Sequence, residues 1–194
     1  MLLYPFPGFA GVYTDSDYAG NTKPIHPKFD PRGRGAGEWP TGAGERARDE
    51  MFLRRAIELA KEAEAGGEVP VGAVAVVGGV IVGEGFNSPR RASDPTAHAE
   101  ILALRAAAAK MGNYRLEDAT LYVTLEPCPM CAGAVVAARL RRLVFGSRDL
   151  RFGGVRSKFR IADSDLLNHR VEIDEGILGA ECQRLLEDFF RGRR

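Results

Sequence analysis

The sequence predicts an α/β fold in which helices cover both faces of one β-sheet, giving three layers. Segments rich in β-branched and aromatic residues alternate along the chain with segments that have the apolar period of a helix. The chain has 194 residues, of which 45% are hydrophobic, so it is long enough for one well-buried domain but short for two. We therefore expect a single core built around one sheet.

The first predicted elements are a helix and a β-hairpin. The helical pattern starts near Asp49 and ends at Gly66-Gly67. Its apolar face is formed by Leu53, Ala56, Ile57, Ala60 and Ala63. Residues 71–77 and 80–86 are rich in β-formers, and Gly78-Gly79 between them suits a two-residue hairpin turn.

The second half of the chain continues the alternation. Asp94-Pro95 is typical of a helix start, with a capping residue before a proline in the first turn, and Gly112 is typical of a helix end. The remaining predicted elements are a strand over residues 120–124, a helix over residues 128 to about 138, strands over residues 142–145 and 171–173, and a final helix with an apolar stripe over residues 177–190. Helices and strands of this length in alternation predict a sheet covered on both sides.

Residues 1–48 differ in character from residues 49–194. This first quarter holds six of the eleven prolines and eight glycines, without a sustained helical or strand period. We interpret it as a poorly ordered extension that precedes a domain over residues 49–194.

Composition also predicts where the protein acts. The sequence contains no run of about 18 apolar residues, so we expect no membrane span. Residues 1–13 lack the Lys or Arg that a secretory signal normally carries. Three cysteines do not make a disulfide framework. We therefore expect a cytoplasmic protein with no membrane association.

The most informative motifs are His98-Ala99-Glu100 and Pro127-Cys128-Pro129-Met130-Cys131. One imidazole and two thiolates fill three corners of a tetrahedral zinc site and leave the fourth corner for water, as in catalytic zinc sites. Zinc lowers the pKa of such a water to about 7, from about 16 in bulk. We therefore expect His98, Cys128 and Cys131 to bind one catalytic Zn²⁺.

Glu100 is predicted to be the general acid and base rather than a fourth ligand. A carboxylate beside the metal can take a proton from water and return it to a leaving group. His98 and Glu100 are about 200° apart around a helix axis, so they converge on one ion only at the end of a helix. Cys-x-x-Cys alone also suits a redox dithiol, but His-x-Glu followed by Pro-Cys-x-x-Cys is the signature of zinc nucleobase deaminases.

The similarity extends well beyond this signature. Over residues 49–194 the chain resembles the bacterial tRNA-specific adenosine deaminases in the motifs Asp94-Pro95-Thr96-Ala97-His98-Ala99-Glu100-Ile101, Asn113-Tyr114-Arg115-Leu116, Tyr122-Val123-Thr124-Leu125-Glu126-Pro127-Cys128, Val144-Phe145-Gly146-Ser147-Arg148-Asp149, Asn168-His169-Arg170-Val171-Glu172-Ile173 and Asp188-Phe189-Phe190. The resemblance implies a cytidine-deaminase-like fold with a mixed five-stranded sheet. It also implies a homodimer with one zinc ion per subunit that converts adenosine to inosine at the wobble position of a tRNA anticodon.

The resemblance also suggests residues that bind the substrate. It places Asn87 against the target nucleoside, and Arg148 and Asp149 beside the substrate loop. Each has a simpler interpretation: Asn87 suits a turn before Pro89, and Asp149 lies among arginines with which it can form salt bridges.

A basic segment is the predicted contact for the tRNA anticodon stem-loop. The whole chain has a net charge of only +1, but residues 139–160 contain eight basic residues and one acidic residue, a local excess of seven. The alternative is a solvated loop and strand edge. Gly153-Gly154 within the segment suggests a mobile loop.

Two other functions fit the zinc motif. A small-molecule deaminase acting on guanine, cytosine or a free nucleoside would share all the zinc residues, although the resemblance and the basic segment favour RNA. A non-catalytic RNA-binding module stabilised by zinc is disfavoured by Glu100 and by the presence of only three evident ligands, because structural zinc usually has four protein ligands.

Overall fold

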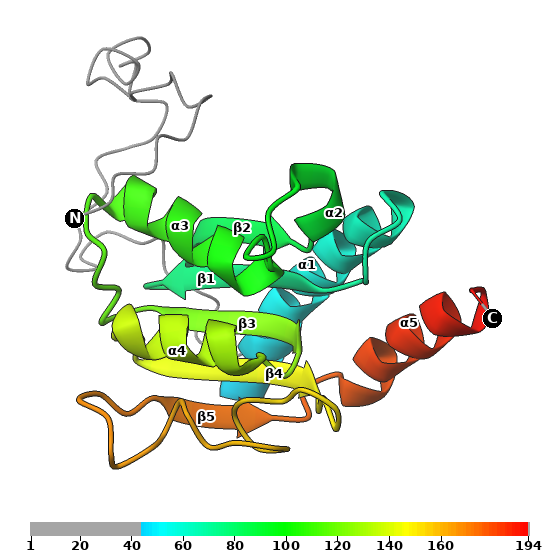
Figure 1. The fold of residues 1–194 in the computed structure, drawn as a ribbon. Coiled ribbons are helices and arrows are strands. Elements are labelled where there is room, and N and C mark those ends of the chain that lie inside the picture. The colour runs from blue at the N-terminus through cyan, green and yellow to red at the C-terminus, as the bar shows by residue number, and fades with distance from the viewer. Residues whose placement is uncertain (1–43, 194) are drawn as a thin grey trace, which may run out of the picture. The chain divides into compact units, whose positions relative to one another are not determined.

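The computed structural model describes residues 44–193, and these residues contain one five-stranded sheet and five helices. The elements in chain order are α1 (Glu45–Ala65), β1 (Gly72–Val77), β2 (Val80–Phe86), α2 (Pro89–Ala92), α3 (Ala99–Met111), β3 (Thr120–Leu125), α4 (Pro129–Ala137), β4 (Arg142–Ser147), β5 (Glu172–Glu175) and α5 (Gly179–Arg191). The strand order is β2-β1-β3-β4-β5 (Figure 1). β1 is antiparallel to β2 and to β3, whereas β3, β4 and β5 are parallel. The predicted mixed sheet is confirmed.

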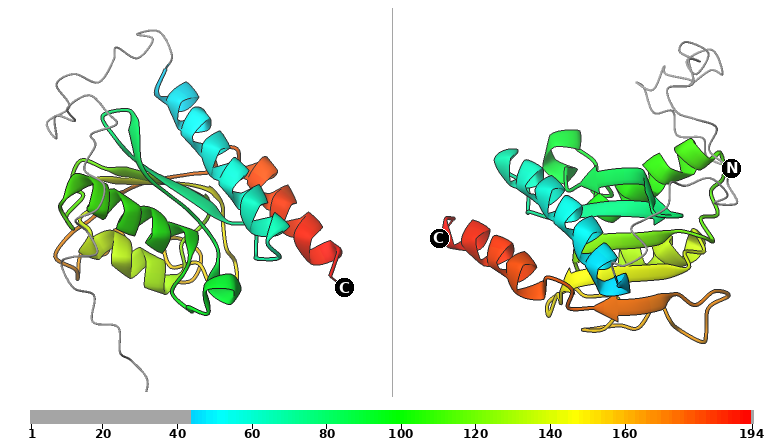
Figure 2. Two further views of the ribbon diagram at one scale, coloured as in Figure 1. Left: turned by 90° about the horizontal axis from the view of Figure 1, so that it is seen from above. Right: turned by 180° about the vertical axis from the view of Figure 1, so that it is seen from behind.

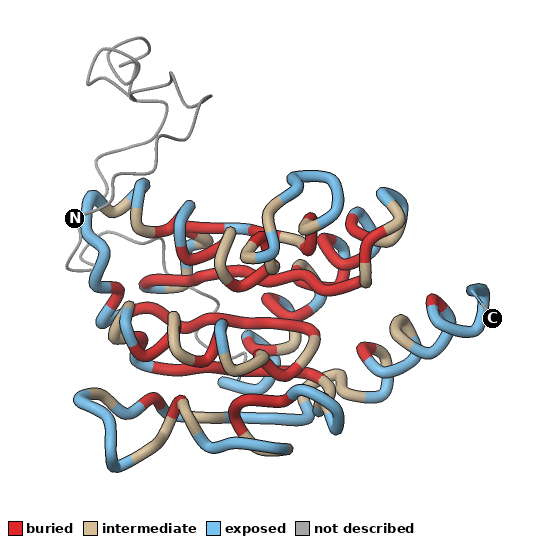
Figure 3. Tube along the Cα trace, viewed as in Figure 1, coloured by how far each residue is buried: buried red, intermediate tan, exposed pale blue. Residues whose placement is uncertain are grey.

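Helices cover both faces of this sheet, which confirms the three layers. Helices α3 and α4 lie on one face, and α1 and α5 lie on the other (Figure 2). Alternate residues of one strand therefore enter different cores: Ala73 and Ala75 of β1 pack on the α3 and α4 side, and Val74 and Val76 pack on the α1 side. The central strands are buried along their length (Figure 3), which explains their nearly continuous apolar sequence.

The predicted hairpin turn between β1 and β2 is confirmed. Gly78 and Gly79 both have positive φ angles, 55° and 79°. This is the backbone of a tight two-residue turn, and glycine adopts it without the steric cost that a side chain would bring. None of the described helices is long and apolar enough to cross a membrane.

Helix α1 begins at Glu45, four residues before the predicted boundary at Asp49. Its first turn is polar, so it has no apolar period that sequence reasoning could detect, and Glu45 interacts favourably with the positive end of the helix dipole. The rest of the predicted extension, residues 1–43, lies outside the described residues.

Helix α3 begins at Ala99, not at the predicted Asp94-Pro95. The Asp94 carboxylate instead accepts hydrogen bonds from the backbone N–H and the hydroxyl of Thr96, at 2.8 and 2.7 Å. This is an Asx turn, which an Asp before a Pro favours as well as a helix cap. The short helix α2, which sequence reasoning did not predict, precedes this turn.

Candidate active site

The loops that follow three strands meet at one edge of the sheet. β3 and β4 are parallel, and β2 runs in the same direction because both it and β3 are antiparallel to β1. Asn87 follows β2, Cys128 follows β3, and Arg148 follows β4. Ligands in α/β proteins bind at the carboxyl ends of strands, so the topology marks this edge as the candidate site.

His98, Cys128 and Cys131 form one group at this edge. The His98 Nδ1 atom lies 3.6 Å from the Cys128 Sγ atom and 3.5 Å from the Cys131 Sγ atom, and the three donor atoms all lie within 4.8 Å of one another. Zinc bond lengths and a tetrahedral angle place a nitrogen and a sulfur ligand about 3.6 Å apart. The donor atoms therefore fit a zinc ion.

Helix ends present these ligands. His98 is the N-cap residue of α3 and Cys128 is the N-cap residue of α4, while Cys131 lies one turn into α4 and is fully buried. The expectation that His98 and its neighbours converge at a helix tip rather than in mid-helix is confirmed. The positive end of a helix dipole stabilises a thiolate, so α4 favours the form of cysteine that binds metals.

The two thiols and the imidazole are linked electrostatically. A hydrogen bond from Cys131 lowers the pKa of Cys128 to about 4, and the same bond raises the pKa of Cys131. A hydrogen bond with Cys128 raises the pKa of His98. A thiolate is therefore held next to an imidazole, which is the donor chemistry that zinc prefers.

Glu100 lies beside this group. Its side chain is buried, with 4% of the residue exposed, and its carboxylate interacts with the Cys131 thiol. Burial raises the pKa of Glu100 to about 7. A carboxyl group that exchanges its proton near neutral pH suits an acid and base catalyst.

Asn87 connects β2 to the start of α3. Its backbone N–H donates to the Val71 carbonyl, and its side-chain oxygen accepts the N–H of Ala99 at 3.0 Å. The oxygen therefore caps α3 directly beside His98. Within the described part of the chain, the Asn87 NH₂ group has no hydrogen-bond partner, so it remains free to donate to a substrate.

Arg148 and Asp149 lie at the same edge, but their side chains contact nearby protein groups. Arg148 forms a two-point ion pair with Glu175 of β5, at 2.8 and 2.6 Å. Asp149 accepts the backbone N–H groups of Arg151 and Phe152, at 2.9 and 3.0 Å. Their contact with a substrate stays a prediction.

The basic segment is less charged in space than in sequence. Arg142 is buried and pairs with Asp49 and Asp174. Asp163 pairs with two further arginines, Arg156 and Arg160. Among the described residues, the basic side chains of the segment without an ion-pair partner are Arg139, Arg141, Arg151 and Lys158. The excess of seven charges along the segment is therefore partly offset in space by acidic partners outside residues 139–160.

Gly153 and Gly154 are buried, which does not favour their interpretation as part of a mobile loop. A Cβ atom on Gly153 would overlap the carboxylate of Glu126, and one on Gly154 would lie 2.7 Å from the Pro129 nitrogen. The glycines are needed for close packing. Sequence reasoning quoted Glu126 only within a family motif and gave it no role, although an acidic residue directly after an apolar strand and before Pro127 was a signal.

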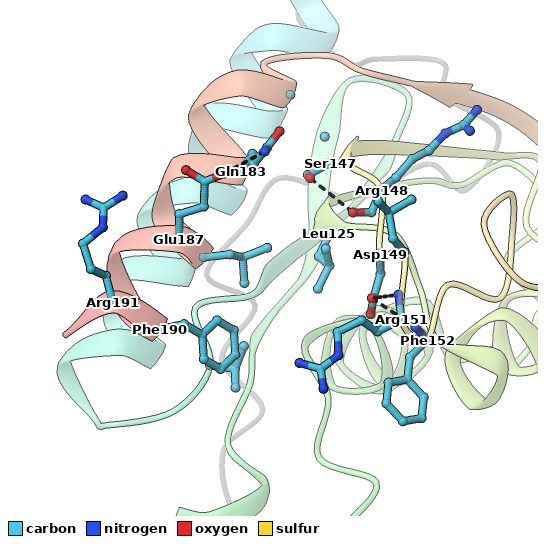
Figure 4. Close-up of a pocket in the computed structure, with 15 residues that line it drawn as sticks. Leu125, Ser147, Arg148, Asp149, Arg151, Phe152, Gln183, Glu187, Phe190 and Arg191 are labelled. Atoms are coloured by element: carbon cyan, nitrogen blue, oxygen red, sulfur yellow. Dashed lines mark hydrogen bonds between the residues drawn. The ribbon is translucent and has the colours of Figure 1, made fainter. Parts of the chain in front are cut away.

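A groove lies between α5 and the loop after β4 (Figure 4). Its volume is about 1090 Å³. Phe190 and Arg191 of α5 stand on one side, and Arg151 and Phe152 stand on the other. Phe152 and Phe190 are 67% and 48% exposed, so the groove has an aromatic residue open to solvent on each side.

Comparisons with known proteins agree with this geometry. Residues 46–147 match the family model described as the cytidine and deoxycytidylate deaminase zinc-binding region. The tRNA-specific adenosine deaminase of Haemophilus influenzae is 52% identical over 147 residues, which cover 75% of this chain and 85% of that protein.

Solved structures are similar as well. One, from a study of A-to-I editing by tRNA:A34 deaminases at the wobble position of transfer RNA, is 40% identical with a TM-score of 0.68 and covers 70% of this chain and 99% of that chain. A guanine deaminase from Nitrosomonas europaea is 26% identical with a TM-score of 0.64, covering 72% of this chain and 83% of that chain.

The zinc motif, the fold and the relatives all agree. The extent of the family match and the identity to curated relatives exceed what a shared fold alone produces. The chain belongs to the cytidine and deoxycytidylate deaminase family, and within it to the tRNA-specific adenosine deaminases.

Proposed function

We propose that this protein removes the amino group of adenosine at the wobble position of a tRNA anticodon by hydrolysis and so produces inosine. The observation that carries the proposal is a buried Glu100 beside the three zinc donors, in a chain 52% identical to a tRNA-specific adenosine deaminase. The chain's similarity to such enzymes also supports a cytoplasmic homodimer.

His98, Cys128 and Cys131 would hold one Zn²⁺ per chain. When bound, zinc supplies a Lewis acid that lets water lose a proton near neutral pH. The distances between the donor atoms of His98, Cys128 and Cys131 support this assignment. The buried position of Cys131 also keeps bulk water away from one side of the site.

Glu100 would move the proton. It would accept a proton from the attacking water and deliver it to N1 of the adenine as the oxygen bonds to C6. It would then pass the second proton of that water to the amino group, so that the C6–N bond breaks, ammonia leaves and the oxygen remains as the C6 carbonyl. Adenosine and water are thus converted to inosine and ammonia. The pKa of about 7 that burial gives Glu100 allows it both to accept and to return the proton at neutral pH.

Asn87 would orient the nucleoside. Because its oxygen is engaged by the N–H of Ala99, the group that can reach a ligand is its NH₂, which donates only. We therefore assign Asn87 to an acceptor atom on the ribose or the base.

The groove of Figure 4 would receive the anticodon loop. Exposed Phe152 and Phe190 offer faces on which unpaired bases stack, and Arg151, which has no ion-pair partner among residues 44–193, can contact phosphate. Loop nucleotides are already unpaired, so moving one into a pocket costs little.

A substrate comparison tests the proposal. The protein is incubated with an anticodon stem-loop that has adenosine at the wobble position and, separately, with free adenosine, guanine and cytosine. We expect product from the stem-loop only, with binding that weakens steeply as salt is raised. Product from a free base, with no response to salt, would identify a small-molecule deaminase instead, and RNA binding without product would identify a non-catalytic module.

A further inference from the structure

Glu126 is a buried acid for which the proposed chemistry has no use. Only 2% of the residue is exposed, and it forms no ion pair with any described residue. Its carboxylate instead accepts five hydrogen bonds from one loop. The Oε1 atom accepts the N–H groups of Val155, Arg156 and Ser157, at 3.1, 2.6 and 2.8 Å. The Oε2 atom accepts the N–H of Asp149 at 3.0 Å and the hydroxyl of Ser157.

The same loop is attached to the chain around Cys128. The Gly154 N–H donates to the carbonyl of Pro127 at 2.7 Å, and the Gly153 N–H closes the loop by donating to the Asp149 carbonyl at 2.8 Å. Gly154 packs on the peptide between Cys128 and Pro129 so closely that a Cβ atom would not fit. We call residues 149–157 the anchored loop.

We propose that Glu126 is a positioning residue, whose carboxylate holds the anchored loop against the Cys128 turn and thereby places Asp149 and Phe152 at the substrate edge. Glu126 directly follows β3 and stands two residues before Cys128, so the strand that positions this zinc donor also positions the loop. One rigid connection therefore couples the chemical centre to the RNA-facing groove.

A carboxylate suits this role because every donor that faces it is an N–H or an O–H. An ionised carboxylate only accepts hydrogen bonds, with about four lone-pair sites on its two oxygens. An amide of the same size replaces one acceptor with a donor. Glu126→Gln therefore keeps the volume of the side chain but changes the hydrogen-bonding pattern.

The geometry predicts which bond Glu126→Gln loses. If the amide nitrogen faced Val155, Arg156 and Ser157, three N–H groups would lose their acceptor. If it takes the Oε2 position, the Ser157 hydroxyl can rotate to accept from it, and only the Asp149 N–H is left without an acceptor. The second orientation is the less costly one, so we expect the loss at Asp149.

Residue-resolved amide hydrogen exchange on the full, zinc-loaded chain tests this without any substrate. In Glu126→Gln we expect exchange at Asp149 to become roughly tenfold faster, as for the loss of one net hydrogen bond, with Val155 to Ser157 little changed. Thr124→Val is the matched control. Thr124 is equally buried, lies two residues earlier and accepts the N–H of Gly72, so its loss should leave the anchored loop unchanged.

A second variant perturbs the same contact from the other side. Gly153→Ala forces its new methyl group against the Glu126 carboxylate, so all the bonded amides of the anchored loop should exchange faster. This variant keeps the test decisive if Glu126→Gln does not fold.

The kinetic test rests on the proposed function. With the anticodon stem-loop as substrate, we expect Glu126→Gln to raise KM roughly tenfold and to change kcat less than about twofold, because the zinc donors and Glu100 stay in place. Zinc content should equal that of the unmodified protein. A purely structural residue would lower the amount of active enzyme without this separation of KM from kcat.

Two results would overturn the proposal: exchange in Glu126→Gln that accelerates evenly over the whole domain, or a lowered kcat at unchanged KM. If the unmodified protein fails to deaminate the stem-loop, the proposed function is wrong. The exchange pattern then still decides the role of Glu126, since it is measured without RNA.

Discussion

Asp49 and Arg142 form a buried two-point ion pair between α1 and β4. The Arg142 Nη1 and Nη2 atoms lie 2.8 and 2.9 Å from the two carboxylate oxygens of Asp49, and the Tyr122 hydroxyl donates to the same carboxylate at 2.8 Å. Both residues of the pair are almost fully buried. The pair fastens the first helix to the end of the sheet opposite the zinc donors, because β3 and β4 both start there.

Removing one partner of this pair should destabilise the domain strongly. In Asp49→Ala, Arg142 loses its main partner while it stays buried, and we expect the free energy of unfolding to fall by about 3–5 kcal/mol. Urea unfolding of the zinc-loaded protein measures the change. Glu181→Ala, which breaks an exposed ion pair with Arg54, is the control and should change little. Equal effects of the two variants would refute the structural role of the buried pair.

Glu100→Ala should abolish most of the turnover without removing the metal. Because Glu100 is not one of the three donors, zinc content should stay the same, while the rate falls at least roughly 10²-fold through loss of general acid and base catalysis. Single-turnover deamination of the stem-loop, with metal analysis of the same sample, measures both quantities. A variant that keeps its zinc and its rate would rule out the proposed proton transfer.

Cys131→Ser should lose zinc. The variant keeps nearly the same shape but replaces a sulfur donor by a hydroxyl that zinc binds poorly, so metal content should fall from about one ion per chain to well below it. The melting temperature should fall with it, because a ligand that binds only the folded state stabilises that state. Cys182→Ser, at a cysteine of the core on the other face of the sheet, should retain the metal, and loss of zinc from both variants would argue against a specific site.

Two variants of Asn87 should separate its two contacts. Asn87→Asp keeps an oxygen for the N–H of Ala99 but has no NH₂ group, so we expect normal thermal stability and at least a roughly tenfold loss in kcat/KM. Asn87→Ala also removes the helix cap and should cost about 1 kcal/mol of stability in addition. Full activity in Asn87→Asp would show that the NH₂ group does not contact the substrate.

Stability should fall in mild alkali because of Cys182. Burial raises the pKa of this thiol to about 12, whereas an unfolded chain has a thiol pKa of about 8.5. Below that value both states keep the proton. Above it only the unfolded chain releases the proton, so the free energy of unfolding falls as pH rises. We expect it to be lower by about 2 kcal/mol at pH 10.

The matched comparison for this effect is Cys182→Ala. The variant is less stable at every pH because a cavity remains, but it lacks the additional loss between pH 8 and pH 10. Urea unfolding in a reducing buffer, repeated between pH 8 and pH 10, gives the slope of the free energy of unfolding against pH for both proteins. Parallel slopes for the two proteins would show that Cys182 titrates normally in the folded state.

Local patterns predicted most of the fold. The apolar period of α1, the Gly78-Gly79 hairpin and the alternation of strands and helices each depend on neighbours in the chain. Sequence reasoning misplaced the start of α3, because Asp94 serves equally well in a cap or in an Asx turn. It also missed the polar first turn of α1, which has no apolar stripe.

The grouping of His98, Cys128 and Cys131 could be predicted because their spacing is a local signature. Contacts between distant segments could not be predicted in this way. The partners of Arg142 and Glu126 come from segments up to 93 residues away, so a count of charges along the chain overstated the positive surface. The pair Gly153-Gly154 suggested mobility, although it serves close packing around Glu126.

The most direct test of the account is nucleoside analysis of an anticodon stem-loop after incubation with the zinc-loaded protein and, in parallel, with Glu100→Ala. The account predicts one inosine per molecule at the wobble position with the unmodified protein and almost none with the variant. An unmodified adenosine in both samples, or equal inosine in both, would contradict it.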